Sequence, residues 1–144
     1  MDDILCIPLE KYETSEGSMM PIYRDWDDSH NGHSPKMVYA TTMNPSTNKG
    51  PILHMERHEF VTAISGVVNV ELMIDNKFVI YSLRDREGNS NILKIPPGIP
   101  KIFSNISKDE CAVIINAPSK AWHPDNPDTF KFTSWEEYVS FKEK

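Results

Sequence analysis

The side chains of this sequence that could carry out chemistry are an imidazole, a carboxylate and an ammonium group, from His54, Glu59 and Lys101. Imidazole titrates near neutral pH, so His54 could act as a general base whose ring is held in place by a neighbouring carboxylate. An ammonium group could stabilise the negative charge that develops when a proton is removed next to a ketone. These residue types indicate proton transfer at a carbon acid, provided that the fold brings them together.

Short runs of β-branched and aromatic residues predict that strands position these side chains, because the runs are separated by Gly, Pro, Asn and Asp. Gly66 and the pair Asp75-Asn76 predict tight turns, since these residues tolerate positive φ. Helical periodicity is almost absent, and no repeat indicates a second unit. We therefore expect one all-β domain over residues 1–144. The expected strands cover residues 3–9, 18–23, 37–42, 60–65, 67–74, 77–83, 91–95, 101–105 and 112–117.

Alternation along these strands predicts which side chains share a face. Glu59 shares a face with Val61 and Ala63, and upstream His54 lies in register with Glu56. Lys101 belongs to a later strand, so only the folding of the sheet can bring it near the other two positions.

The C-terminal residues differ from the rest of the chain. Ser134 and Glu137 form a capping box, and Trp135, Tyr138 and Phe141 follow at a spacing that places them on one helical face. We expect a short C-terminal helix that packs these aromatic rings on the outside of the sheets.

Composition excludes several classes of partner. The chain has 15 basic and 21 acidic residues, with a formal charge of −6 and no basic stripe, which disfavours nucleic acid. Its N-terminus is acidic and only briefly apolar, which does not fit a signal peptide. No apolar run approaches the ~18 residues of a membrane span. Two cysteines, Cys6 and Cys111, are too few for a disulfide framework, which favours a reducing, cytoplasmic setting.

Two sequence motifs resemble those of the cupin superfamily. In one, Glu59 precedes Gly66 in a strand; in the other, Pro-Pro-Gly at 96–98 is followed by Lys101 and Asn105. Further segments are similar to the dTDP-4-dehydrorhamnose 3,5-epimerase branch of cupins, the RmlC-like branch. This resemblance covers roughly residues 18–130 and implies a jelly-roll β-barrel with an inward-facing Glu59. The segments are residues 37–45, 49–50, 65–66, 95–98, 105–106 and 122–128.

The resemblance implies a nucleotide-sugar enzyme that works without metal or other cofactor. In that branch a histidine held by a carboxylate removes the proton next to a 4-keto group, a lysine stabilises the enolate, and a tyrosine reprotonates the opposite face. Carried over to this chain, His54 would be the base, Glu56 or Glu59 its partner, and Lys101 the cation at the enolate oxygen.

The chain also departs from that pattern. An ungapped alignment places Ile52 where the branch has its catalytic histidine, and residues 113–122 contain no tyrosine. We therefore expect a related epimerase or isomerase of polysaccharide or deoxysugar biosynthesis with a different acid–base set. One alternative is a binding cupin without catalysis. Another is a metal-dependent oxygenase or isomerase, although Ile52 and Lys101 replace two histidines of the metal-binding motif.

Nucleotide binding requires cations for the diphosphate and a flat surface for the base. Lys49, Arg24 and Arg57 are the candidate phosphate ligands. For Arg57 a position at the solvated surface is favoured, as it is for His58.

Four aromatic residues could contact the ligand or simply pack. Trp26 and Trp122 could stack on the base or cover a barrel end, and Tyr39 or Tyr81 could supply the missing acid if it faces inward. The expected substrate-binding residues are accordingly Lys49, Glu56, Arg24, Tyr39 and Trp122.

Cupins of this branch commonly form homodimers in which an N-terminal strand is exchanged. Residues 3–9 and the outward Phe60, Thr62 and Ile64 are the candidates for such an interface.

Overall fold

The computed structural model describes residues 3–26, 32–85 and 90–144. One sheet contains β1 (Leu5–Pro8), β4 (Tyr39–Met43), β6 (Glu59–Ser65), β9 (Asn91–Ile95) and β11 (Ala112–Asn116). The other contains β5 (Thr47–His54), β7 (Val67–Ile74), β8 (Lys77–Arg84), β10 (Lys101–Asn105) and β12 (Thr129–Lys131). A separate hairpin pairs β2 (Tyr12–Thr14) with β3 (Gly17–Met19), and the single helix of the described residues is α1 (Trp135–Lys142).

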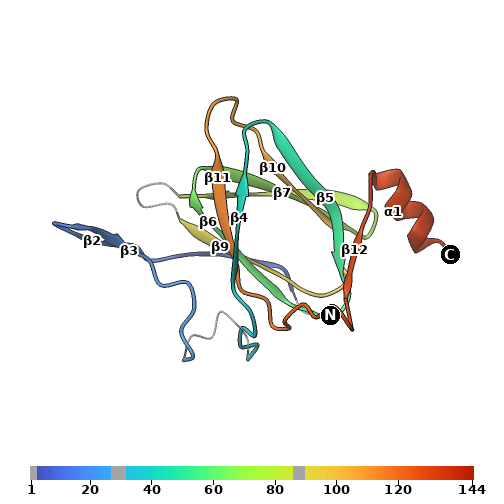
Figure 1. Cartoon of the computed structure of the whole chain (residues 1–144), viewed down its shortest axis with the longest axis horizontal. Helices are drawn as coiled ribbons and strands as arrows, with labels where there is room; N and C mark the ends of the chain where they lie inside the picture. The colour runs from blue at the N-terminus through green and yellow to red at the C-terminus, as the bar shows by residue number, and fades with distance from the viewer. Residues whose placement is uncertain (1–2, 27–31, 86–89) are drawn as a thin grey trace.

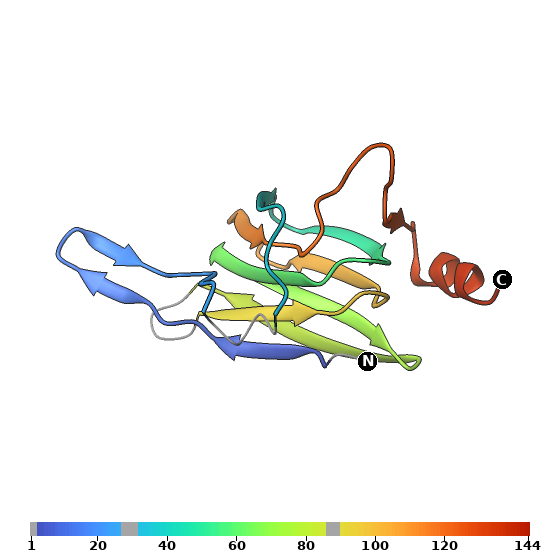
Figure 2. The same cartoon turned by 90° about the horizontal axis from the view of Figure 1, so that it is seen from below.

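The two five-stranded antiparallel sheets face each other (Figure 1 and Figure 2). Their strand orders are β1-β9-β6-β11-β4 and β12-β5-β10-β7-β8, so strands distant in sequence are neighbours in each sheet. This arrangement confirms the expected all-β jelly-roll fold with a short C-terminal helix. Among the described residues, no helix is long and apolar enough to span a membrane.

The strands follow the predicted hydrophobic pattern, with three omissions. β7, β9 and β10 have the predicted bounds, whereas β2, β5 and β12 were not predicted. The pattern of β5 is broken by Gly50 and Pro51, residues that usually end a strand. Gly50 has a φ of +126°, and a Cβ there would lie 2.5 Å from the carbonyl oxygen of Lys101. Glycine is thus required where β5 passes close to β10.

The inward faces of both sheets form the core. Val61 and Ala63 of β6 are fully buried, as are Val70 and Leu72 of β7, and Phe103 of β10 packs in the same cluster. The alternation predicted for β6 is confirmed, because Glu59 is buried on this inner side as well.

The outer face of the first sheet is covered by the chain's own N-terminal segment. Phe60 belongs to a second buried cluster, against which Ile7, Leu9 and Ile22 pack. The expectation that Phe60 and Thr62 form part of a dimer interface is therefore wrong, since both are buried within one chain. Ile64, near the end of the same strand, remains partly exposed.

The helix α1 forms as predicted and packs on the outer face of the second sheet. The Ser134 hydroxyl accepts a hydrogen bond from the Glu137 N–H at 3.1 Å, which caps the first turn. The Trp135 Nε1 donates to Glu71 of β7 at 2.8 Å, and Tyr138 is buried. These contacts hold α1 against β7, whereas Phe78 and Ile80 of β8 remain exposed.

Candidate functional site

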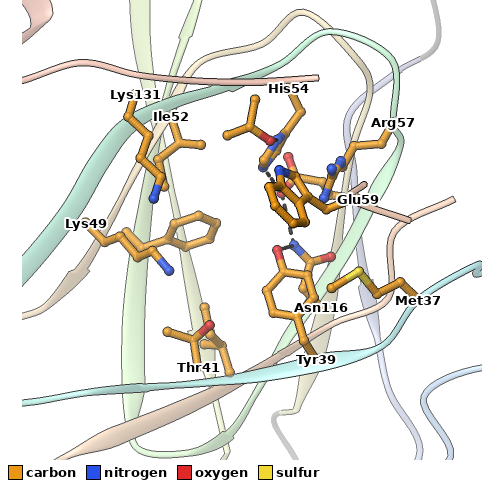
Figure 3. A pocket seen from close by; sticks show the side chains of 14 residues that line it. Met37, Tyr39, Thr41, Lys49, Ile52, His54, Arg57, Glu59, Asn116 and Lys131 are labelled. Carbon is orange, nitrogen blue, oxygen red and sulfur yellow. Dashed lines mark hydrogen bonds and ion pairs between the residues drawn. The ribbon is translucent and has the colours of Figure 1, made fainter. Parts of the chain in front are cut away.

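A cavity of about 200 Å³ opens between the two sheets, lined by residues of β4, β5, β6, β10, β11 and β12. Figure 3 shows Lys49, Ile52 and Lys131 on one side of it and Tyr39 and Asn116 on the other. The side with Lys49, Ile52 and Lys131 comes from β5 and β12 of the second sheet. The side with Tyr39 and Asn116 comes from β4 and β11 of the first sheet. The cavity therefore presents cations and apolar groups opposite a polar, hydrogen-bonded wall.

Glu59, the first residue of β6, is the electrostatic centre of the polar wall. Its Oε2 forms an ion pair with the Lys101 ammonium group, and its Oε1 accepts a hydrogen bond from Asn116 Nδ2 at 3.0 Å. The same Oε1 lies 3.4 Å from His54 Nε2. The fold thus brings together the imidazole, carboxylate and ammonium groups that were singled out from the sequence.

The carboxylate of Glu59 is ionised although it is only 1% exposed. Burial raises its pKa, but the charge of Lys101, together with His54 and the hydrogen bonds it accepts, lowers that pKa below the ordinary value. Lys101 is itself fully buried and is not among the residues that line the cavity. Its ammonium group is engaged by Glu59, so this structure does not place it where a substrate enolate could reach it.

His54, the last residue of β5, lines the cavity as a neutral imidazole. Its Nδ1 lies 2.8 Å from the Thr129 hydroxyl, which is its register partner in β12. Burial lowers the pKa of His54 to about 4; the charges of Lys101 and Arg57 act in the same direction and that of Glu59 against it. A neutral ring at pH 7 is able to accept a proton.

Tyr39 of β4 supplies a phenol on the same wall. Its oxygen accepts a hydrogen bond from Asn116 Nδ2 at 2.9 Å, so its own proton remains available for another acceptor. Burial, with Glu59 nearby, raises the pKa of Tyr39 to about 12. Asn116 Oδ1 is buried and has no hydrogen-bond partner among the described residues. Tyr39 is therefore a neutral potential proton donor, whereas Tyr81 packs against the core.

Two of the expected substrate-binding residues lie away from the cavity. Glu56 is exposed and forms an ion pair with Lys120 at 2.8 Å, because β5 ends at His54 and the strand alternation does not continue beyond it. Arg24 lies over the ring of Trp26, 5.0 Å from its centroid. The inward position predicted for Glu56 is therefore wrong, whereas phosphate binding by Arg24 stays a prediction.

The other expected binding residues do line the cavity. Lys49 and Trp122 lie at its exposed edge, and Trp122 is 48% exposed. Tyr39, as described above, contributes to its wall. His58 makes no part of the lining; its ring stacks on His33 with the centroids 3.6 Å apart.

Sequence reasoning missed the buried ion pair between Arg57 and Asp128. Arg57 was expected at the surface, yet both side chains are only 2% exposed, and the Arg57 Nε donates to Asp128 at 2.9 Å. Arg57 also lines the cavity. No local sequence pattern pairs these two residues, because their contact depends on β12 adding to the edge of the second sheet.

Lys131, Thr129 and Asn116 were also missed. Lys131 and Thr129 lie on the short strand β12, which has only three residues and no clear alternation. Asn116 is the last residue of β11; it lay inside the predicted strand of residues 112–117, where no sequence pattern marked it as a site residue.

The donor set does not resemble a metal site. Ile52 is buried beside the cavity at one position of the metal-binding motif, and Lys101 at the other is engaged by Glu59. Within the described ranges no three His, Cys, Asp or Glu side chains gather as metal ligands.

Comparison with protein families gives one match. Residues 2–138 match the FdtA family, described as WxcM-like, C-terminal. Comparison with curated proteins gives no match.

Solved structures share the fold over most of this chain. QdtA, a sugar 3,4-ketoisomerase from Thermoanaerobacterium thermosaccharolyticum in complex with TDP, is 19% identical, with 97% of this chain and 96% of that chain covered and a TM-score of 0.73. A dTDP sugar isomerase from Desulfovibrio desulfuricans G20 is 15% identical, with 94% and 87% covered and a TM-score of 0.81. The RmlC epimerase of Mycobacterium tuberculosis is 13% identical, with 91% and 69% covered and a TM-score of 0.73. At these identities the likeness establishes the fold.

Proposed function

Because the chain belongs to the FdtA family and has an RmlC-like cupin fold, we propose that it is a nucleotide-sugar isomerase or epimerase. The substrate class is a 4-keto-6-deoxyhexose linked to a nucleoside diphosphate, and the setting is cytoplasmic polysaccharide or deoxysugar biosynthesis. The observation that carries the proposal is the neutral His54 imidazole in the cavity wall, with Glu59 beside its Nε2 and Tyr39 nearby.

The chemistry that this wall supports is removal of a proton next to a ketone. In the proposed step the neutral imidazole of His54, which lies between the Thr129 hydroxyl and Glu59, takes the proton from the sugar carbon. The imidazolium that forms lies beside the ionised Glu59, which stabilises its charge. Tyr39 is the candidate donor of a proton to the neighbouring carbon, in place of the tyrosine that residues 113–122 lack.

Between the two reactions, a shift of the keto group is favoured over epimerisation. The alignment covers 96% of the 3,4-ketoisomerase chain but 69% of the RmlC epimerase chain. Such a shift moves one proton from C3 to C4 and a second from the C3 hydroxyl to the C4 oxygen, through an enediol. It is redox-neutral overall, so the proposed reaction requires no redox cofactor.

The cations of the cavity suit a phosphorylated ligand. Lys49 and Lys131 lie on one side of the cavity, and the exposed indole of Trp122 offers a flat surface for a nucleobase at its edge. With the diphosphate near these lysines, the sugar ring would enter the cavity toward His54.

Solvent deuterium exchange tests the proposal. We expect the protein to accelerate the incorporation of deuterium from D2O into dTDP-4-keto-6-deoxyglucose at the carbon next to the ketone, followed by appearance of the 3-keto isomer. Nuclear magnetic resonance of the sugar detects both events. Absence of any acceleration at saturating protein would contradict an enzymatic role on this substrate.

A second candidate function is binding without catalysis. It is favoured by Ile52, which replaces the histidine that the resemblance places there, and by the missing tyrosine of residues 113–122. Calorimetric binding of the same nucleotide sugar without exchange or turnover would select this function over the first.

We also propose that the chain forms homodimers through its N-terminal hairpin. β2 and β3 extend away from the two sheets (Figure 2), and all their residues are exposed. An isolated two-stranded hairpin is marginally stable in water, so a second copy that packs against it would explain its persistence. Light scattering at micromolar concentration should give twice the mass of one chain. A monomeric mass would contradict the proposal.

A further inference from the structure

The carboxylate of Glu59 is the point at which both candidate proton-transfer groups converge. Its Oε1 lies 3.4 Å from His54 Nε2 and accepts from Asn116 Nδ2, which also donates to the Tyr39 oxygen. We propose that Glu59 is a positioning residue that Lys101 keeps ionised, so that one buried carboxylate orients the base His54 and, through Asn116, the acid Tyr39. This inference deepens the proposed function and rests on it for the roles of His54 and Tyr39.

The hydrogen bonds of Asn116 carry the first half of this inference. Both of its amide hydrogens are used, one toward Glu59 and one toward Tyr39. The charge of Glu59 fixes the amide in this orientation, because the opposite one would bring Oδ1 against a carboxylate oxygen. With the amide fixed, the Tyr39 oxygen is an acceptor and its proton is free to be donated into the cavity.

The ion pair with Lys101 carries the second half. Lys101 and Glu59 are 0% and 1% exposed, so water does not solvate either charge. Without Lys101, the buried carboxylate would bind a proton or draw one onto His54, and the base would then already be occupied. Lys101 therefore acts through Glu59 and not on the substrate.

Other charged groups also face His54 and define the background of any titration. Arg57 precedes β6, and Asp128 lies at the start of the segment that forms β12; these two form a neutral pair. Lys49 and Lys131 line the far side of the cavity. None of these four is changed in the experiment below, so their contribution cancels between variants.

The experiment follows the ring protons of His54 by nuclear magnetic resonance as pH is varied, in the wild type and in three variants. The variants are Lys101→Met, Glu59→Gln and the double variant that carries both changes. Lys101→Met leaves one uncompensated negative charge, so the His54–Glu59 pair should take up a proton at least about one pH unit higher than in the wild type. In the double variant neither charge is present, and His54 should titrate within about half a unit of its wild-type position.

A matched control removes a buried lysine elsewhere. Lys94 of β9 is 2% exposed and pairs with Phe60, so it lies on the face of the sheet opposite Glu59. Lys94→Met should leave the titration of His54 unchanged. If Lys101→Met does not fold, the double variant and Glu59→Gln still test the inference, because the pair can be removed without leaving a charge unpaired.

Kinetics give a second readout. Glu59→Gln should lower kcat at least about tenfold while KM changes less than about twofold, because the role proposed for Glu59 is exerted on His54 and Asn116. The acid limb of the pH profile of kcat/KM should move to higher pH in Lys101→Met and return to its wild-type position in the double variant.

The outcomes for the two proposals are distinguishable. The titration of His54 needs no substrate, so it reports on Glu59 and Lys101 even if the protein shows no isomerase activity. The same titration in the wild type and Lys101→Met, or a double variant that behaves like Lys101→Met, would overturn the positioning role of Glu59.

Discussion

Replacement of His54 by glutamine is expected to slow solvent deuterium exchange into the sugar by at least about a hundredfold, the low end of what a positioned general base contributes. Glutamine retains polar contact with Thr129 but cannot take up a proton at neutral pH. Because His54 ends β5 beside the cavity and is not a core packing residue, the variant should fold. Exchange is measured on dTDP-4-keto-6-deoxyglucose in D2O at pH 7.

His58→Gln is the matched control, because His58 stacks on His33 outside the cavity lining. This variant should keep the wild-type exchange rate. Tyr39→Phe separates the two halves of the reaction: exchange should persist while the isomerised product forms at least about a hundredfold more slowly. Equal exchange by the wild type and His54→Gln would remove His54 as the base.

Replacement of Asp128 by asparagine is expected to lower the free energy of unfolding by roughly 3–5 kcal/mol, as for other buried ion pairs that lose one partner. Asp128 and Arg57 are each 2% exposed, so the variant leaves the Arg57 guanidinium buried without a counter-charge. Urea denaturation at pH 7 measures the change. Asp125→Asn is the control: its side chain is 90% exposed in the same segment, and its effect should stay within about 0.5 kcal/mol.

The contribution of this pair also depends on pH. Burial raises the pKa of Asp128, but the hydrogen bond and charge of Arg57 outweigh burial and lower it below the ordinary value. The stabilisation is therefore present above the pKa of Asp in the unfolded chain and is lost as pH falls through the depressed pKa of the folded state. An Asp128→Asn variant as stable as the wild type at pH 7 would contradict this account.

The strands that enclose the core could be predicted from the sequence because their pattern is local. The apolar alternation in β7 and the proline and glycine around β9 and β10 fixed the bounds of these strands. The inward position of Glu59 followed from the same alternation, with the resemblance to cupins deciding which face was inside. The convergence of His54, Glu59 and Lys101 was predictable to that extent, although their catalytic roles remain predictions.

The rest of the site depends on contacts that no local pattern encodes. Glu56 was placed inside by extending the alternation of β5 beyond His54, where the strand in fact ends. Arg57 read as a surface charge because arginine is rarely buried without a partner, and its partner Asp128 lies far along the chain. Asn116 was only one residue of the predicted strand 112–117, yet it connects Glu59 to Tyr39.

The short strand β12 has a consequence for how the protein is made. Asp128, Thr129 and Lys131 are the last cavity-wall or ion-pair residues of the site to leave the ribosome, after the other nine strands of the two sheets have been synthesised. A nascent chain that stops short of Asp128 has the residues for the first sheet and for the other four strands of the second, but no partner for Arg57 and no hydroxyl beside His54 Nδ1. The candidate site is thus complete only once β12 has paired with β5, and a truncation before Asp128 would remove both contacts.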